Sequence, residues 1–253
     1  MIFDVQRFPA PTKAAVRALA PTGTLRAAIN LSNFLLVSHT SSSGVPVGVS
    51  PDMATALANR LGVPVELRTY PNPGDVADAA GSATWDIGNI GAEPARAKHI
   101  DFSPAYAEIE CTYLVPPGST IKSFDDIDQP GIKVSVKARA AYALWLERNL
   151  RHAELVESDS LDSSFTTFVE LGLDALAGLR PRLAADLQQV TDGRILDGKF
   201  SAVQQAIGTP VGRDPAGIGY LRRFVAAACS NGFVSDRIAA HDATGLSAAA
   251  GIE

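Results

Sequence analysis

The segment WDIGNIGAEPARAKHIDFSPAY, residues 85–106, is the most informative part of this chain. Asp86 to Gly91 is predicted to form a short buried strand that runs into a tight turn. Pro94 suits the first position of a helix, and Arg96 follows about half a turn later. Free backbone N–H groups at a helix start favour an anion, and a guanidinium can hold both oxygens of a carboxylate. The segment therefore predicts a carboxylate-binding site.

An isolated arginine near a helix start is most often an ordinary surface residue, so the prediction depends on the joint pattern. A strand, a small-residue turn, a helix start and an Asp-Phe-Ser-x-x-Tyr exit follow one another in order. The residues that carry this pattern are Asp86, Gly88, Arg96-Ala97-Lys98, Asp101-Phe102-Ser103 and Tyr106. They resemble the signature of the family 3 extracellular solute-binding proteins, the polar-amino-acid receptors of ABC importers.

The resemblance extends from about residue 23 to the carboxyl terminus and implies an α/β, two-lobed, periplasmic-binding-protein-like type II fold. Each lobe is then a mainly parallel sheet flanked by helices. Lobe 1 is discontinuous, with residues 1–109 plus 206–253, and lobe 2 comprises residues 110–205. Two hinge strands connect the lobes, one near residues 108–113 and the other near 203–210.

Local patterns predict the first elements of the chain. A short helix is expected near residues 12–19, a strand over 25–31, a turn or hairpin in the Ser- and Gly-rich stretch 38–48, and a strand over 63–70. Between the last two, Met53, Leu57 and Leu61 recur with helical spacing, and Gly62 is the expected stop. Strands that alternate with helices of this length favour a largely parallel sheet.

The composition is that of a globular protein. Of 253 residues, 46% are hydrophobic and 19% are charged, and the formal net charge is -5. The acidic balance and the lack of a dense Lys/Arg cluster argue against a nucleic-acid partner. No apolar run approaches the roughly 20 residues that span a bilayer, so we expect no membrane insertion. The resemblance adds the expectation of a monomer.

Neither the cysteines nor the histidines are spaced like metal ligands. Cys111 and Cys229 are far apart; two buried thiols are favoured, and a disulfide bond is the alternative in an oxidising compartment. The four histidines are His39, His99, His152 and His241. We expect no metal and no cofactor.

The start of the chain conflicts with the location that the resemblance implies. The first nine residues, MIFDVQRFP, carry an acid where a signal peptide carries positive charge, and no long apolar run follows. We therefore expect no secretion signal in this chain. A periplasmic location follows from the resemblance and a cytoplasmic one from the amino terminus, and the sequence does not choose between them.

Ligands of such folds lie at the carboxyl ends of strands, so loop tips and helix starts are the candidates. The candidates in lobe 1 are Asn30, Asn33, Asn89, Gly91 and Arg96, and those in lobe 2, after a strand predicted over 133–137, are Arg139, Ala140 and Tyr142. For Asn33 and Asn89 the alternative is that an asparagine in a turn tolerates left-handed backbone.

Three positions depart from the resembled pattern. Glu93 stands where relatives have a threonine, and it either caps or neutralises Arg96, orients its guanidinium, or receives an amino group. The second-lobe helix start reads Arg139-Ala140-Ala141, without the usual hydroxyl. Leu179 occupies the position of the acid that clasps the amino group of an amino acid ligand. The sequence therefore favours a small organic acid with a second anionic or polar group, unless Glu93 or Asp174 replaces the missing acid.

The resemblance implies a receptor that captures a small carboxylate or amino-acid-like ligand by hinge closure and then docks on an ABC permease, with no bond made or broken. An enzyme on the same fold, of the cyclohexadienyl dehydratase type, is the alternative, with Glu93 as a proton donor. Against it, no second catalytic group stands at convincing spacing. A ligand-sensing module that acts on a protein partner is a third interpretation.

Overall fold

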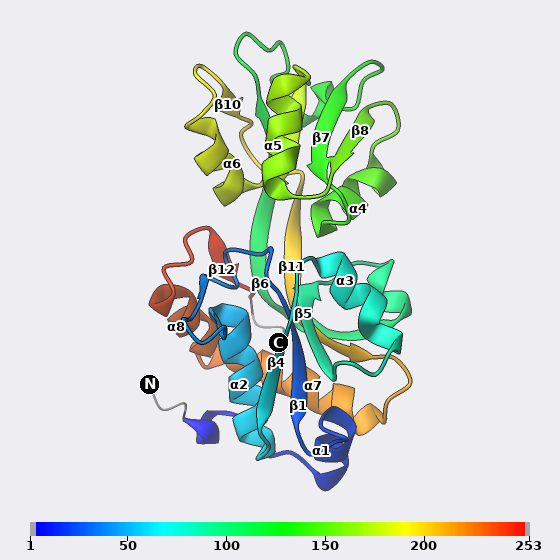
Figure 1. The fold of residues 1–253 in the computed structure, drawn as a ribbon, viewed down its shortest axis with the longest axis vertical. Coiled ribbons are helices and arrows are strands. Elements are labelled where there is room, and N and C mark those ends of the chain that lie inside the picture. Colours follow the sequence, from blue (N-terminus) through cyan, green and yellow to red (C-terminus); the bar gives the residue numbers. More distant parts are fainter. Residues whose placement is uncertain (1–3, 251–253) are drawn as a thin grey trace. The chain divides into compact units, whose positions relative to one another are not determined.

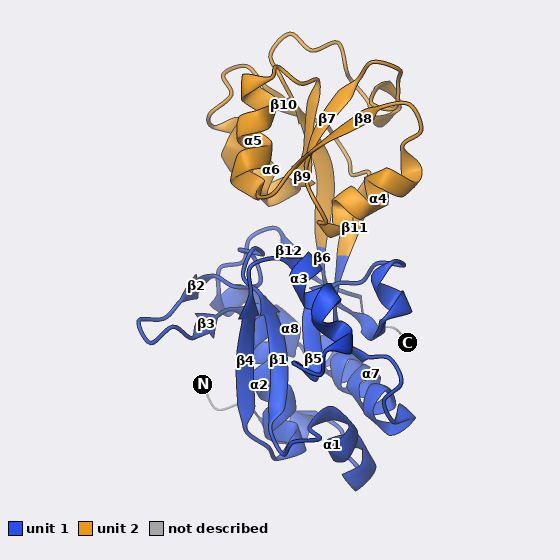
Figure 2. Ribbon diagram, turned by 45° about the vertical axis from the view of Figure 1, so that its right-hand side comes forward, with its two compact units in different colours: residues 1–108, 204–253 blue, residues 109–203 orange. Residues whose placement is uncertain are grey.

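A computed structural model describes residues 4–250 as a mixed α/β protein (Figure 1). The chain divides into two compact units (Figure 2). Unit 1 comprises Met1–Glu108 and Gln204–Glu253, and unit 2 comprises Ile109–Val203. Two long strands, β6 (Ile100–Val115) and β11 (Ser201–Pro210), carry the chain from one unit to the other.

Unit 1 is built on a sheet in which the strand order is β4-β1-β5-β11-β6. Its parallel strands are β1 (Leu25–Asn30), β4 (Val65–Tyr70) and β5 (Ile87–Gly91). Strand β11 runs antiparallel to β5, and β12 (Leu246–Ala248) pairs with β6. The stretch 38–48 forms the small hairpin of β2 (His39–Thr40) and β3 (Pro46–Val47), as predicted.

The helices of unit 1 are α1 (Lys13–Leu19), α2 (Val49–Leu61), α3 (Pro73–Asp78), α7 (Pro215–Ser230) and α8 (Phe233–Ala240). The prediction of the first two is confirmed. Thr12 caps α1, because its hydroxyl accepts a hydrogen bond from the backbone N–H of Ala15 at 3.1 Å. Helix α2 ends at Gly62, whose φ of 71° is the left-handed conformation that glycine adopts without strain.

Unit 2 contains the parallel strands β7 (Lys133–Lys137), β8 (Glu154–Ser158) and β9 (Ala175–Leu179), and β6 pairs antiparallel with β9. The short strand β10 (Arg194–Ile195) pairs with β6. The helices are α4 (Ala141–Asn149), α5 (Leu161–Glu170) and α6 (Arg180–Leu187). Leu183 of α6 packs close to Gly178 of β9, where a Cβ atom would lie 3.1 Å from the Leu183 Cδ2 atom.

The two cysteines lie in different units and form no disulfide bond. Cys111 is buried in β6, and Cys229 is half-buried in α7. Burial raises the pKa of the Cys229 thiol to about 11, so this thiol is protonated at neutral pH.

Gly208 of β11 is closely packed against its neighbours in unit 1. A Cβ atom at this position would overlap the side chain of Ile100 and would lie 3.0 Å from the Phe102 ring. We expect Gly208→Ala to lower the free energy of unfolding by about 1–3 kcal/mol, because both neighbours are packed in the core. Urea denaturation measures the change. Gly219→Ala in α7 is the matched control, since its Cβ would approach no atom closer than 3.8 Å; an equal loss there would contradict the packing argument.

Candidate functional site

The carboxyl ends of β1 and β5 place the predicted unit 1 residues at one edge of the sheet. The two strands are parallel, with Ala28 opposite Gly88 and Ile29 opposite Asn89. Asn30 therefore ends its strand beside the end of β5, where Gly91 is the last residue. In open α/β sheets this edge is the one that binds ligands.

Asn30 and Asn33 shape the loop that leaves β1. The Asn30 Oδ1 atom accepts hydrogen bonds from the Ser32 backbone N–H at 3.1 Å and from the Ser32 hydroxyl at 2.9 Å. The Asn33 Oδ1 atom accepts from the backbone N–H of Leu35 at 3.2 Å. Neither asparagine has positive φ, so left-handed backbone does not explain them; their side chains close local turns instead.

Arg96 lies at the predicted edge, but the expected helix start is wrong. Residues Arg96–Lys98 form a single 3-10 turn, η3, and Pro94 precedes it instead of opening a helix. The segment 92–99 forms only this turn before the chain enters strand β6 at Ile100. No helix dipole supports an anion here.

The guanidinium of Arg96 provides a buried positive charge at this edge of the sheet. The side chain is buried, with 5% of the residue exposed, and its Nη1 atom donates a hydrogen bond to the carbonyl oxygen of Gly91 at 2.7 Å. This bond fixes the guanidinium against the end of β5. Glu93 lies between the strand and the turn and is half-buried; its carbonyl oxygen accepts from the N–H of Ala97 at 2.9 Å.

Asn89 is the most unusual of the predicted residues. It is 1% exposed in the middle of β5, and neither its Nδ2 nor its Oδ1 atom has a hydrogen-bond partner among the residues described. Buried polar side chains are nearly always paired, so an orphaned amide requires an explanation. Its φ is not positive either, which removes the turn interpretation.

The predicted unit 2 residues follow strand β7. Arg139 is exposed and has a φ of 59°, a conformation that is unfavourable for a side chain with a Cβ atom. Ala140 is the N-cap of α4 and offers no side-chain hydrogen bond to its first N–H groups. The hydroxyl of Tyr142 is buried without a geometrically good partner among the described residues, and burial raises its pKa above the ordinary range.

The structure adds polar residues in unit 2 that the sequence did not single out. Arg182 in α6 donates from Nε to Asp186 at 2.9 Å and lies 2.7 Å from Asp162 at the start of α5. Asp186 is almost fully buried, and burial raises its pKa although Arg182 opposes this. Arg182 and Asp186 are four residues apart, the spacing of an ion pair on a helix, and this spacing is visible in the sequence. Lys137, at the end of β7, is also buried.

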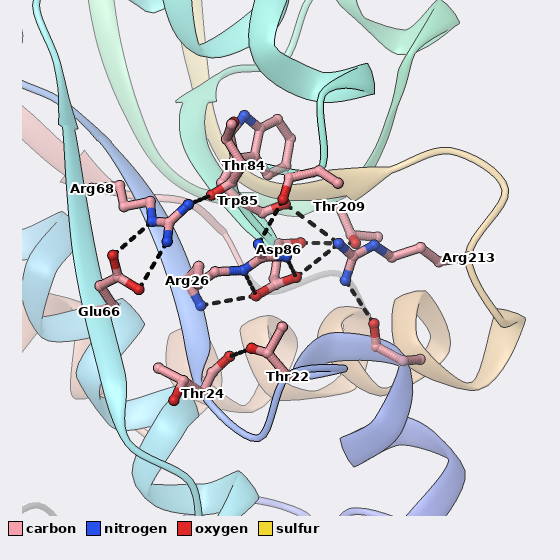
Figure 3. A network of polar contacts seen from close by, with 12 residues as sticks. Thr22, Thr24, Arg26, Glu66, Arg68, Thr84, Trp85, Asp86, Thr209 and Arg213 are labelled. Carbon is pink, nitrogen blue, oxygen red and sulfur yellow. Dashed lines mark hydrogen bonds and ion pairs between the residues drawn. The ribbon is translucent and has the colours of Figure 1, made fainter.

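Asp86, although part of the predicted motif, is a structural residue (Figure 3). Its carboxylate is fully buried at the start of β5. It accepts two hydrogen bonds from the guanidinium of Arg26, from Nε at 2.8 Å and from Nη2 at 2.7 Å. Arg213 adds a third contact, from Nη2 at 2.8 Å. Burial alone raises the pKa of Asp86, but hydrogen bonds from Arg26 and Arg213 outweigh it and hold the pKa below its ordinary value.

Two further features of the described residues bear on function. No helix in residues 4–250 has the length and apolar character needed to cross a membrane. Within the same part of the chain, no three His, Cys, Asp or Glu side chains are grouped closely enough to hold a metal ion.

Solved structures share this fold. An ancestral amino acid-binding protein, described as a precursor of cyclohexadienyl dehydratase, is 22% identical with a TM-score of 0.72, over 90% of this chain and 98% of that one. An arginine-bound amino acid ABC transporter substrate-binding protein from Streptococcus pneumoniae is 20% identical with a TM-score of 0.72, over 90% and 99%. A histidine kinase sensor domain similar to periplasmic binding proteins is 18% identical with a TM-score of 0.73, over 89% and 98%. A search of curated proteins found no match.

These likenesses define the class as the periplasmic-binding-protein-like fold, and the predicted fold class is confirmed. The family model of the bacterial extracellular solute-binding proteins, family 3, matches residues 26–216. The chain belongs to this family, as the motif of residues 85–106 predicted, and the family supports a solute-binding role.

Proposed function

We propose that this protein is the receptor of an ABC importer and that it captures a small carboxylate or amino-acid-like ligand by closure of two lobes. The observation that carries the proposal is the buried Arg96 at the carboxyl end of β5, with the orphaned Asn89 two residues before that end. A buried guanidinium recognises a carboxylate strongly, because water does not screen the pair.

The ligand site that we propose combines residues of both units. Unit 1 contributes Asn30, Asn33, Asn89, Gly91, Glu93 and Arg96, and unit 2 contributes Arg139, Ala140 and Tyr142. The carboxylate binds to Arg96, while Arg139 supplies a second cation for another anionic or polar group of the ligand. Leu179 offers no charge to an ammonium group, so a carboxylate without an amino group is the preferred ligand.

The location and the partner follow from this role. The receptor works outside the cytoplasmic membrane as a monomer and delivers its ligand to a membrane permease. Extracellular proteins are typical of the family, and two of the similar structures are described as proteins of amino acid ABC transporters.

A thermal-shift screen of the purified protein tests the proposal. The panel contains dicarboxylates, simple monocarboxylates, aromatic acids and α-amino acids, and calorimetry confirms each hit. A ligand that binds only the folded state raises the melting temperature by mass action, so about 3 kcal/mol is gained at a concentration of 100 Kd. A hit among carboxylates without product formation supports the receptor. If no carboxylate stabilises the protein, the proposal is wrong.

A dehydratase is the second candidate, because one similar structure is the ancestral precursor of such an enzyme and Glu93 lies three residues before Arg96. In this alternative Glu93 donates a proton to a leaving group while Arg96 holds the substrate carboxylate. An activity assay with prephenate and arogenate, at a protein concentration in the micromolar range, distinguishes the enzyme from the receptor. Turnover that is abolished by Glu93→Gln supports the enzyme, and binding at unit stoichiometry without product supports the receptor.

A further inference from the structure

Strand β11 places a glutamine beside the orphaned Asn89. β11 and β5 are antiparallel, with Gln205 opposite Gly91 and Ile207 opposite Asn89. Directly opposed residues of an antiparallel pair point to the same face of the sheet, and so do residues two apart on one strand. Gln205 and Asn89 are therefore diagonal neighbours on one face. Gly91, between them, contributes no side chain to that face.

Both side chains are buried, but only the amide of Asn89 is recorded without a partner. Gln205 is 4% exposed. Asn89 is 1% exposed, and neither its Nδ2 nor its Oδ1 atom has a hydrogen-bond partner among the described residues. A buried amide without a partner destabilises the fold, because it loses its hydrogen bonds to water on folding. A second buried amide side chain next to Asn89 is not expected of a packed core.

The neighbours of the pair show that apolar side chains are compatible with this face. Ile207 and Ile29 are the residues directly opposite Asn89, and both are fully buried. The main-chain carbonyl of Gly91 faces Arg96, which donates to it at 2.7 Å. The amide pair thus lies beside the guanidinium that we propose as the carboxylate anchor.

We propose that Gln205 is a specificity-determining residue, and that with Asn89 it binds an uncharged hydroxyl group of the carboxylate held by Arg96. This inference rests on the proposed function. Each amide offers an acceptor oxygen and donor N–H groups, and a hydroxyl both donates and accepts a hydrogen bond. Neither amide carries the negative charge that a buried ammonium requires. The preferred ligand is then a hydroxylated carboxylate.

Matched pairs of acids test the inference by calorimetry. Malate is compared with succinate, and lactate with propionate, so that each pair differs by one hydroxyl group. We expect the wild-type protein to bind the hydroxylated member about tenfold more tightly, the effect of one well-placed hydrogen bond. In Gln205→Leu the ratio should fall to about one. Gln204→Leu, next on the strand and on the opposite face, should keep the wild-type ratio.

The outcomes separate this inference from the proposed function. Arg96→Ala should weaken both members of a pair alike. An equal ratio in Gln205→Leu and wild type overturns the role of Gln205 and leaves the carboxylate receptor standing. Failure of these and all other carboxylates to bind overturns both proposals. The melting temperature of the ligand-free protein is a second measurement: Gln205→Leu should not lower it, and a drop of several degrees would show that Gln205 only supports the fold.

Discussion

Arg96→Ala is expected to weaken the binding of any carboxylate ligand by about 2–5 kcal/mol, the range measured when one partner of a buried charge pair is removed. Arg96 is 5% exposed and its guanidinium is held against Gly91, so the group is already fixed when the ligand arrives. Calorimetry with the carboxylate that gives the largest thermal shift measures the change. Arg96→Lys keeps the charge but not the planar fork, and it should recover only part of the lost affinity.

Lys98→Ala is the matched control for this prediction. Lys98 belongs to the same 3-10 turn and is exposed, so its removal changes the local charge by the same amount without touching the site. Its affinity should equal that of the wild type. Arg96→Ala also removes the donor to the Gly91 carbonyl, and melting curves must show that the variant is folded at the assay temperature. Wild-type affinity in folded Arg96→Ala would show that the site lies elsewhere.

The sequence predicted correctly those helices and turns that are determined by residues close together in the chain. Helix α2 follows from the spacing of Met53, Leu57 and Leu61, and its end follows from Gly62. The family motif placed Arg96 at the end of β5, but the helix expected there depended on Pro94 alone. The chain after Pro94 forms only the 3-10 turn Arg96–Lys98 before β6 begins at Ile100, so the pairing of β6 prevails over helix formation.

Non-local pairing explains what the sequence could not show. Gln205 reaches Asn89 only because β11 pairs with β5, more than a hundred residues away in the chain, and no spacing reports that register. Arg213 is a second case, since it joins Asp86 across 127 residues. Asp86 belongs to the predicted motif, but the motif does not reveal its role, because a signature residue that binds a ligand and one that stabilises a lobe look alike in sequence.

Replacement of Asp86 by alanine is expected to lower the free energy of unfolding by about 3–5 kcal/mol, because it leaves the guanidinium groups of Arg26 and Arg213 without their shared, fully buried carboxylate. Urea denaturation at pH 7 measures the loss. Glu66→Ala is the control: Glu66 pairs with Arg68 near the same cluster but is exposed, and its removal should cause no measurable change. Equal effects of the two substitutions would contradict the structural role of Asp86.

The same carboxylate predicts how stability depends on pH. The pKa of Asp86 is lower in the folded protein than in the unfolded chain, where a value of about 3.9 is ordinary. Its contribution is therefore complete above about pH 4 to 5 and is lost as the pH falls through the folded pKa, because the unfolded chain then binds the proton first. Asp86→Asn removes this titration. As the pH is lowered from about 6 to about 3, the free energy of unfolding should therefore fall less steeply in the variant than in the wild type. An unchanged slope would mean that other carboxylates control acid unfolding, whereas a flatter slope assigns this part of the acid sensitivity to the cluster of Asp86, Arg26 and Arg213.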